Sequence, residues 1–90
     1  MVAKFLQNNN IDITYAELPT YFAGMYVSIH NRNVVVINNS IIEEAKNYYA
    51  IALSYFCIIK KEPNKILLNS STEEQLEALS FADNFFKQRE

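Results

Sequence analysis

The sequence has few of the residues that usually build catalytic motifs. Its 90 residues include one glycine, one cysteine, one histidine and no tryptophan. A single glycine excludes a glycine-rich phosphate-binding loop. A single cysteine cannot form a disulfide within the chain, so we expect a reducing, cytoplasmic location. A lone histidine and a lone cysteine do not make a metal site, and we expect neither a metal nor another cofactor.

Clustered positive charge and long apolar runs are also missing. Eight Lys and Arg stand against ten Asp and Glu, for a net charge of −2. The basic residues are scattered, which argues against direct nucleic-acid binding. The apolar run at residues 48–59 is shorter than the ~17–20 residues that span a bilayer. Residues 1–8 do not resemble a signal peptide. We therefore expect no contact with a membrane.

What is present is a globular composition, with 50% hydrophobic residues and 20% charged residues. We expect one domain over residues 1–90. A domain this small buries only about 60–65% of its unfolded surface, so its own stability is modest. A protein partner or a homodimer is the expected source of additional stability.

The N-terminal half predicts strands after a short helix. Residues 2–8 predict a helix that stops at consecutive asparagines, and the alternation in residues 11–15 predicts a short strand. Gly24 precedes the next strand, where a close backbone approach or a positive φ is useful. Residues 25–38 predict a β-hairpin that turns at 31–33. The continuously apolar second arm, 34–37, is typical of a strand that is central in a sheet or covered on both faces.

The C-terminal half predicts two helices. Ser40 and Glu43 form a capping box, which predicts a helix over about residues 41–60 that ends before Pro63. Residues 66–68 predict an apolar link. Ser71 and Glu74 form a second capping box and predict a helix over 72–87. The expected fold is α+β, with a small antiparallel sheet packed on two or three helices.

The order of several short motifs resembles one known family. The motifs are Glu17-Leu-Pro, Phe22-Ala-Gly, Val34-Val-Val-Ile-Asn, Ile51-Ala and Glu77-Ala-Leu-Ser-Phe-Ala. Together they resemble the ImmA/IrrE family of HExxH zinc metallopeptidases over roughly residues 11–86. The resemblance implies that this chain is a truncated, degenerate relative.

The HExxH residues of that family are replaced here. The resemblance places Leu53 and Cys57 at the two zinc-binding histidines and Ser54 at the general-base glutamate. Leucine cannot bind zinc, and serine cannot act as the carboxylate base. Glu77 alone matches, at the acidic residue of the later helix. The resemblance therefore implies a pseudoenzyme with no catalytic residues and no metal.

Other candidate residues have simple structural interpretations. His30, at the hairpin tip, is more often a bystander than a ligand. Cys57 is more often a small buried hydrophobe. The tyrosines exceed what so small a core hides, and core and interface roles stay open for each. The candidate interface residues are Tyr21, Tyr26, Tyr48, Tyr49 and Tyr55.

Three functions follow as hypotheses. The first is a non-catalytic antirepressor of a phage or mobile element that binds a helix-turn-helix repressor stoichiometrically, because members of the family resembled act on such repressors. The second is a self-associating or host-directed inhibitor that binds an unrelated protein through an exposed aromatic patch. The third is a residual hydrolase, which predicts bound zinc and peptidase activity lost on Glu77→Ala.

Overall fold

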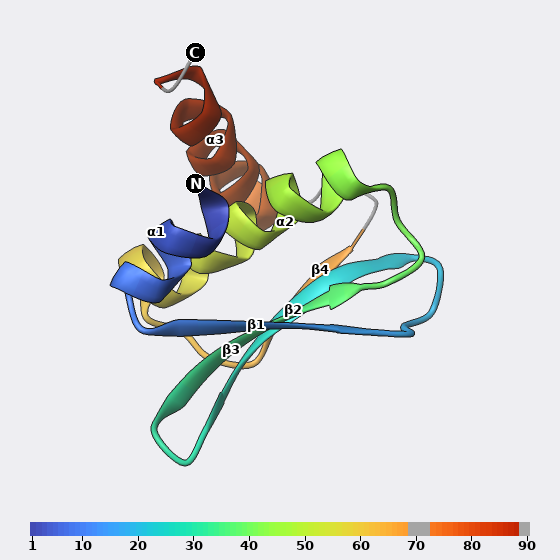
Figure 1. Cartoon of the computed structure of the whole chain (residues 1–90), viewed down its shortest axis with the longest axis horizontal. Coiled ribbons are helices and arrows are strands. Elements are labelled where there is room, and N and C mark those ends of the chain that lie inside the picture. The colour runs from blue at the N-terminus through green and yellow to red at the C-terminus, as the bar shows by residue number, and fades with distance from the viewer. Residues whose placement is uncertain (69–72, 89–90) are drawn as a thin grey trace.

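The chain folds as a four-stranded sheet with its helices on one side (Figure 1). The computed structural model describes residues 1–68 and 73–88. Its elements are α1 (Val2–Asn8), β1 (Ile11–Ala16), β2 (Phe22–Ile29), β3 (Arg32–Asn38), α2 (Glu43–Tyr55), the π-helical turn η1 (Phe56–Lys60), β4 (Lys65–Leu68) and α3 (Glu73–Lys87). The predicted α+β class, a small sheet packed on helices, is confirmed.

The sheet is mixed, and the prediction of an antiparallel sheet is wrong for β1. The strand order is β1-β3-β2-β4. β2 pairs antiparallel with both β3 and β4, whereas β1 pairs parallel with β3. After β1 the chain skips one strand position to form β2, and the hairpin then returns β3 into the gap. The segment expected to be an apolar link, 66–68, is part of the edge strand β4.

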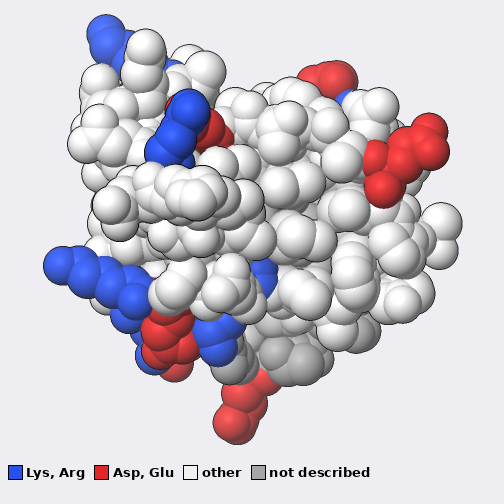
Figure 2. All heavy atoms as spheres, turned by 90° about the horizontal axis from the view of Figure 1, so that it is seen from below, with Lys and Arg blue, Asp and Glu red and all other residues white. Residues whose placement is uncertain are grey.

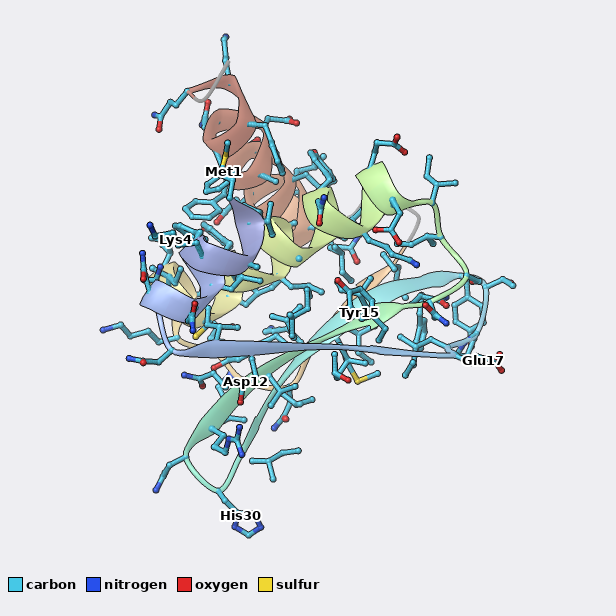
Figure 3. The ribbon with its side chains drawn as sticks, viewed as in Figure 1. Met1, Lys4, Asp12, Tyr15, Glu17 and His30 are labelled. Atoms are coloured by element: carbon cyan, nitrogen blue, oxygen red, sulfur yellow. The ribbon has the colours of Figure 1, made fainter. Side chains whose placement is uncertain are left out.

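The hairpin turns one residue earlier than predicted. Ile29 pairs with Arg32, which leaves His30 and Asn31 as a two-residue turn. Both have positive φ, 50° and 65°, as the tight turns that match strand twist require. His30 is exposed at the hairpin tip and points away from the body of the molecule (Figure 3), where the sequence placed it.

Gly24 lies inside β2, at a point that two other elements approach closely. A Cβ at this position would stand 2.5 Å from the Val36 carbonyl oxygen and 2.9 Å from Cδ1 of Leu53. Its φ is not positive. The expectation of a close approach is confirmed, and the glycine is what lets α2 lie against the middle of the sheet.

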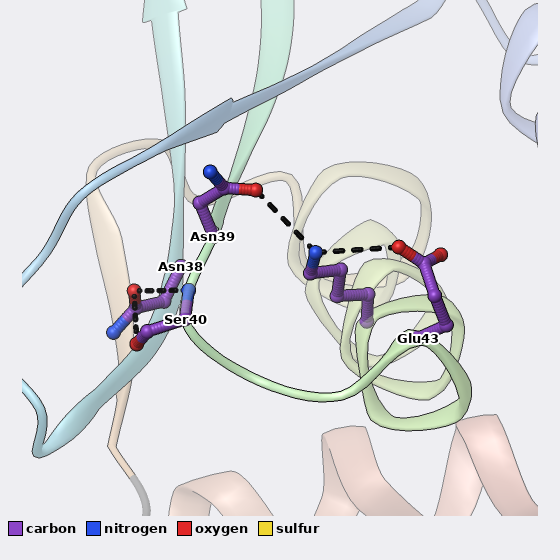
Figure 4. Close-up of polar contacts among 5 residues, drawn as sticks. Asn38, Asn39, Ser40 and Glu43 are labelled. Carbon is purple, nitrogen blue, oxygen red and sulfur yellow. Dashed lines mark hydrogen bonds and ion pairs between the residues drawn. The ribbon is translucent and has the colours of Figure 1, made fainter.

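The capping box predicted at Ser40 does not form. The Ser40 amide and hydroxyl both donate to Oδ1 of Asn38, at 3.1 Å and 2.9 Å (Figure 4). α2 instead begins at Glu43, with Ile42 as an N-cap residue that makes no side-chain hydrogen bond. The serine hydroxyl is thus used by the end of β3 and not by the helix.

Asn38 is a fully buried amide that fixes the connection between β1 and β2. Its Nδ2 donates to the carbonyls of Leu18, Pro19 and Phe22 at 3.3, 3.1 and 2.9 Å. These bonds give hydrogen-bond partners to carbonyls of the β1–β2 connection and to the carbonyl of the first residue of β2.

The long predicted helix, 41–60, is α2 continued by η1. Lys61 follows η1 in the left-handed conformation, with φ 55°, and ends the helical segment at the predicted place. Ser71, on which the second predicted capping box depends, lies outside the described residues, and α3 is described from Glu73.

The core lies between the sheet and the helices. Residues 50–54 of α2 are all buried, five in succession, so this helix is enclosed on nearly every side. The buried hydrophobic cluster comprises Leu6, Ile11, Ala23, Tyr26, Val35, Ile37, Ala50, Ile51, Ala52, Leu53, Phe56, Leu67, Ala78, Ala82 and Phe85.

Candidate protein-binding site

The positions that would carry the HExxH residues are part of the core. Leu53 is fully buried and packs against Gly24 of β2. Ser54 is also fully buried, and its hydroxyl donates to the carbonyl of Ile51 at 2.6 Å. Cys57 is half-buried and packs against the core cluster, close to the expected small hydrophobe. These three side chains stabilise α2 against its neighbours.

Glu77 lies against a different face of α2. Its Oε2 accepts a hydrogen bond from the Tyr55 hydroxyl at 2.5 Å and stands 4.0 Å from Nζ of Lys60. Tyr55 follows Leu53 by two residues, or about 200° around a helix of 3.6 residues per turn. The structure therefore does not bring Glu77 together with Leu53 and Cys57 into one site.

Neither metal-ligand clusters nor membrane spans occur in the part of the chain that the structure describes. Over residues 1–68 and 73–88, no three His, Cys, Asp or Glu side chains are grouped closely enough to hold a metal ion. Over the same residues, no helix combines the length and apolar character needed to cross a bilayer.

Tyr26 belongs to the core, so of the two roles left open for this candidate the core role holds and the interface role does not. It is 4% exposed, and its hydroxyl donates to Oδ1 of Asn33 at 2.8 Å. Burial, with a smaller contribution from the neighbouring Cys57 thiol, raises the pKa of Tyr26 to about 12. The ring faces the helices from the middle of β2.

Two α2 tyrosines join this helix to α3. The Tyr48 hydroxyl donates to Oδ1 of Asp83 at 2.9 Å and to the Leu79 carbonyl at 3.2 Å. Burial and then the Asp83 carboxylate raise the pKa of Tyr48 to about 12. The hydrogen bond to Glu77 is the main cause that raises the pKa of Tyr55. Each phenol thus donates to a carboxylate on α3.

The remaining two predicted tyrosines differ in setting. Tyr49 is half-buried and packs edge-on against Tyr48, with ring centroids 5.6 Å apart. Tyr21 is 61% exposed in the segment before β2 and packs against Phe22. Tyr49 thus lies beside a tyrosine that contacts α3, whereas Tyr21 lies beside the start of β2.

Two open grooves flank α3, and each begins at one of the α2 tyrosines. The first, of about 430 Å³, is lined by Tyr55, Leu76, Glu77, Ser80, Phe81 and Asn84. The second, of about 490 Å³, is lined by Glu44, Asn47, Tyr48, Asp83, Phe86 and Lys87. We refer to these as the Tyr55 groove and the Tyr48 groove. Both combine apolar side chains with carboxylates.

The apolar residues of α3 recur at three- and four-residue spacings and form one broad face, and the sequence did not predict grooves beside it. Leu76 is 51% exposed, and Phe81 and Phe86 are only half-buried. The buried side chains of α3 include Ala78, Ala82 and Phe85. The width of the apolar face was a signal that some of its side chains stay exposed, because a helix packed on one side needs an apolar stripe of only about 100°.

Comparisons with family models, with curated proteins and with solved structures give no match.

Proposed function

We propose that the chain is a non-catalytic protein-binding module, a degenerate relative of the ImmA/IrrE-type metallopeptidases that binds a helix-turn-helix repressor stoichiometrically. Such binding makes it an antirepressor of a phage or mobile element. The observation that carries the proposal is the pair of open grooves beside α3. They present apolar side chains to solvent beside two α3 carboxylates, Glu77 and Asp83, that accept hydrogen bonds from tyrosines of α2.

The interior of α2 supports a structural role for the segment that aligns with HExxH. Leu53 and Ser54 are fully buried, and each makes a core contact. Restoring histidine and glutamate there would place polar groups in an apolar core, at a cost of several kcal/mol. The surface beside α3 is then the part of this region that is available to a partner.

The charges beside the grooves favour a basic partner. The two groove linings carry three acids, Glu44, Glu77 and Asp83, against one base, Lys87. A DNA-binding repressor has a basic surface, because it must neutralise phosphates. An amphipathic basic helix, with its apolar side chains in a groove and its cations towards these carboxylates, is complementary to this surface.

Calorimetric titration against the repressor encoded nearest to this chain tests the proposal. We expect one-to-one binding, and electrophoresis afterwards should show the repressor intact. Leu76→Lys adds a cation to the Tyr55 groove and should weaken binding more than about tenfold, equivalent to 1.4 kcal/mol. The matched control is Ile42→Lys. Ile42 is also exposed and has a side chain of the same size as leucine, but it lies outside both groove linings.

Three outcomes contradict the proposal. They are no binding, binding followed by repressor cleavage, and binding that Leu76→Lys leaves unchanged. A pull-down that retrieves an unrelated protein instead, and loses it on Leu76→Lys, would favour the host-directed inhibitor.

A further inference from the structure

The sheet has a second apolar face that no described helix covers. Side chains alternate along a strand, so those next to the core residues Tyr26, Val35 and Ile37 point the other way. The apolar side chains on this opposite face, which we call the open face, are Met25, Val27 and Ile29 of β2, Val34 and Val36 of β3, and Ile66 of β4.

The open-face side chains form one continuous patch across three strands. Met25 pairs with Val36 of β3 on one side and with Ile66 of β4 on the other. Val27 pairs with Val34. Side chains of directly opposed residues lie about 5 Å apart, so these pairs are in contact distance.

This patch is outside the core. None of its six residues belongs to the buried hydrophobic cluster or packs against it. Ile29 is 53% exposed and Ile66 is 47% exposed. Figure 3 shows the same division on β1, where Asp12 projects away from the helices and Tyr15 projects towards them.

The open face is electrically balanced. One ion pair stands at its β1 side, where Nη2 of Arg32 lies 2.6 Å from Oδ2 of Asp12. Viewed from below the sheet, the molecule shows a broad area without Lys, Arg, Asp or Glu atoms across its middle (Figure 2). A face with one cation and one anion repels neither a cationic nor an anionic surface, and it is complementary to a copy of itself.

We propose that the open face is the contact of a symmetric homodimer in which two copies pack sheet against sheet. A two-fold axis places the same patch on both sides, so an apolar, balanced surface is self-complementary. Two packed sheets lie about 10 Å apart and interdigitate their side chains, as in a β-sandwich. The acidic α3 surface has no such self-complementarity, because two copies of it bring like charges together.

The size of the face fits a reversible dimer. Four strands about 4.8 Å apart and five residues of about 3.3 Å each give a face of roughly 300 Å² in projection. With the relief of its side chains, two such faces bury roughly 1,000 Å², the lower limit for a specific interface. Interfaces of this small size belong mostly to weak, transient complexes, so we expect dissociation at roughly 1–100 μM.

Sedimentation equilibrium over about 1 μM to 1 mM measures this directly. We expect a monomer–dimer equilibrium for the unmodified chain. Val36→Lys places a cation from each copy at the centre of the contact and should weaken dimerisation more than about thirtyfold. The matched control is Leu76→Lys, an added lysine on α3, which should leave the dimer unchanged. Circular dichroism checks that both variants fold.

A second variant protects the test if Val36→Lys does not fold. Thr14 pairs with Val36, is exposed and lies at the side of the patch, so Thr14→Arg should keep the fold and weaken the dimer about three- to tenfold. A chain that stays monomeric at about 1 mM overturns the proposal, as does a dimer lost on Leu76→Lys but kept in both open-face variants. A monomer whose repressor binding is lost on Val36→Lys also overturns it and assigns the face to the repressor.

Discussion

Four consecutive residues of β3 allow the two faces of the sheet to be compared, because their side chains are chemically alike. Val35 and Ile37 are fully buried beneath α2, whereas Val34 and Val36 are half-buried on the side without helices. All four side chains are aliphatic and β-branched. The covered face stabilises the monomer, and we propose that the open face stabilises a contact between copies. The continuous apolar run predicted a strand that is central or covered on both faces. β3 is central, between β1 and β2, and within the described chain helices cover only one of its faces.

A charge placed on one face or the other should give the largest difference in the free energy of unfolding. Val35→Asp buries a carboxylate without a partner and should cost more than about 4 kcal/mol, most of the stability of a domain of this size. Val36→Asp should cost the monomer about 1 kcal/mol, the usual range of strand propensity. Urea unfolding of both at a concentration that keeps the chain monomeric measures this. Equal losses would break the comparison.

Added or removed volume should show a smaller difference of the same kind. Gly24→Ala puts a methyl group 2.5 Å from a backbone oxygen, so the sheet or α2 must shift, at about 1–3 kcal/mol. Met25→Ala, the next residue on the open face, should cost the monomer less than about 1 kcal/mol, because it leaves no closed cavity. Thermal unfolding at low concentration gives both values, and a Gly24→Ala variant as stable as the parent would contradict the close approach.

The phenol of Tyr26 makes the stability of the covered face depend on alkaline pH. Because its pKa is raised from 10.0 to about 12 on folding, its contribution is complete below pH 10 and is lost as the pH rises towards 12. Tyr26→Phe should lower stability by about 1 kcal/mol at neutral pH, through loss of the hydrogen bond to Asn33. The difference in stability between this variant and the parent chain should shrink as the pH rises from 10 to 12.

Urea midpoints measured across that alkaline range test this dependence. Tyr21→Phe is the matched control, because the Tyr21 ring is exposed and its phenol contributes little to folding. A Tyr26→Phe variant whose midpoint falls as steeply as that of the parent chain would show that Tyr26 is not the group responsible.

The smallest effect is expected from the ion pair of the open face. Both side chains are largely exposed, 73% for Arg32 and 53% for Asp12, so solvent screens their attraction. Asp12→Asn should change the free energy of unfolding by less than about 0.5 kcal/mol. Chemical denaturation at two salt concentrations checks this. A loss above about 1 kcal/mol would mean that the open face stabilises the monomer after all.

Local sequence patterns predicted the helices and strands better than they predicted which strands pair with one another. The hairpin was predicted with its turn displaced by one residue, and the last helix, predicted over 72–87, is described as α3 from Glu73 to Lys87. The partner of β1 was not predictable, because Ile11-Asp-Ile-Thr specifies a strand but not its direction relative to β3. The capping box at Ser40 does not form because the Ser40 hydroxyl donates its hydrogen bond to the buried side-chain amide of Asn38.

The candidate site was predictable only in part. Tyr48 and Tyr55 do line open grooves, as an interface role requires, whereas Tyr26 is buried. All three belong to apolar runs, and their side-chain directions depend on which helix face meets the sheet. The open face was missed because the apolar run 34–37 fits a central strand as well as a strand covered on both faces, and the sequence alone does not separate the two.

Intermolecular NOEs between isotope-labelled and unlabelled copies test the central claim most directly. In a mixed sample at about 1 mM, we predict contacts from the methyl groups of Val27, Val34 and Val36 to the unlabelled copy, and none from Val35. Contacts confined to Leu76 and the other groove residues of α3, or no intermolecular contacts at all, would contradict the assignment of the open face to a second copy.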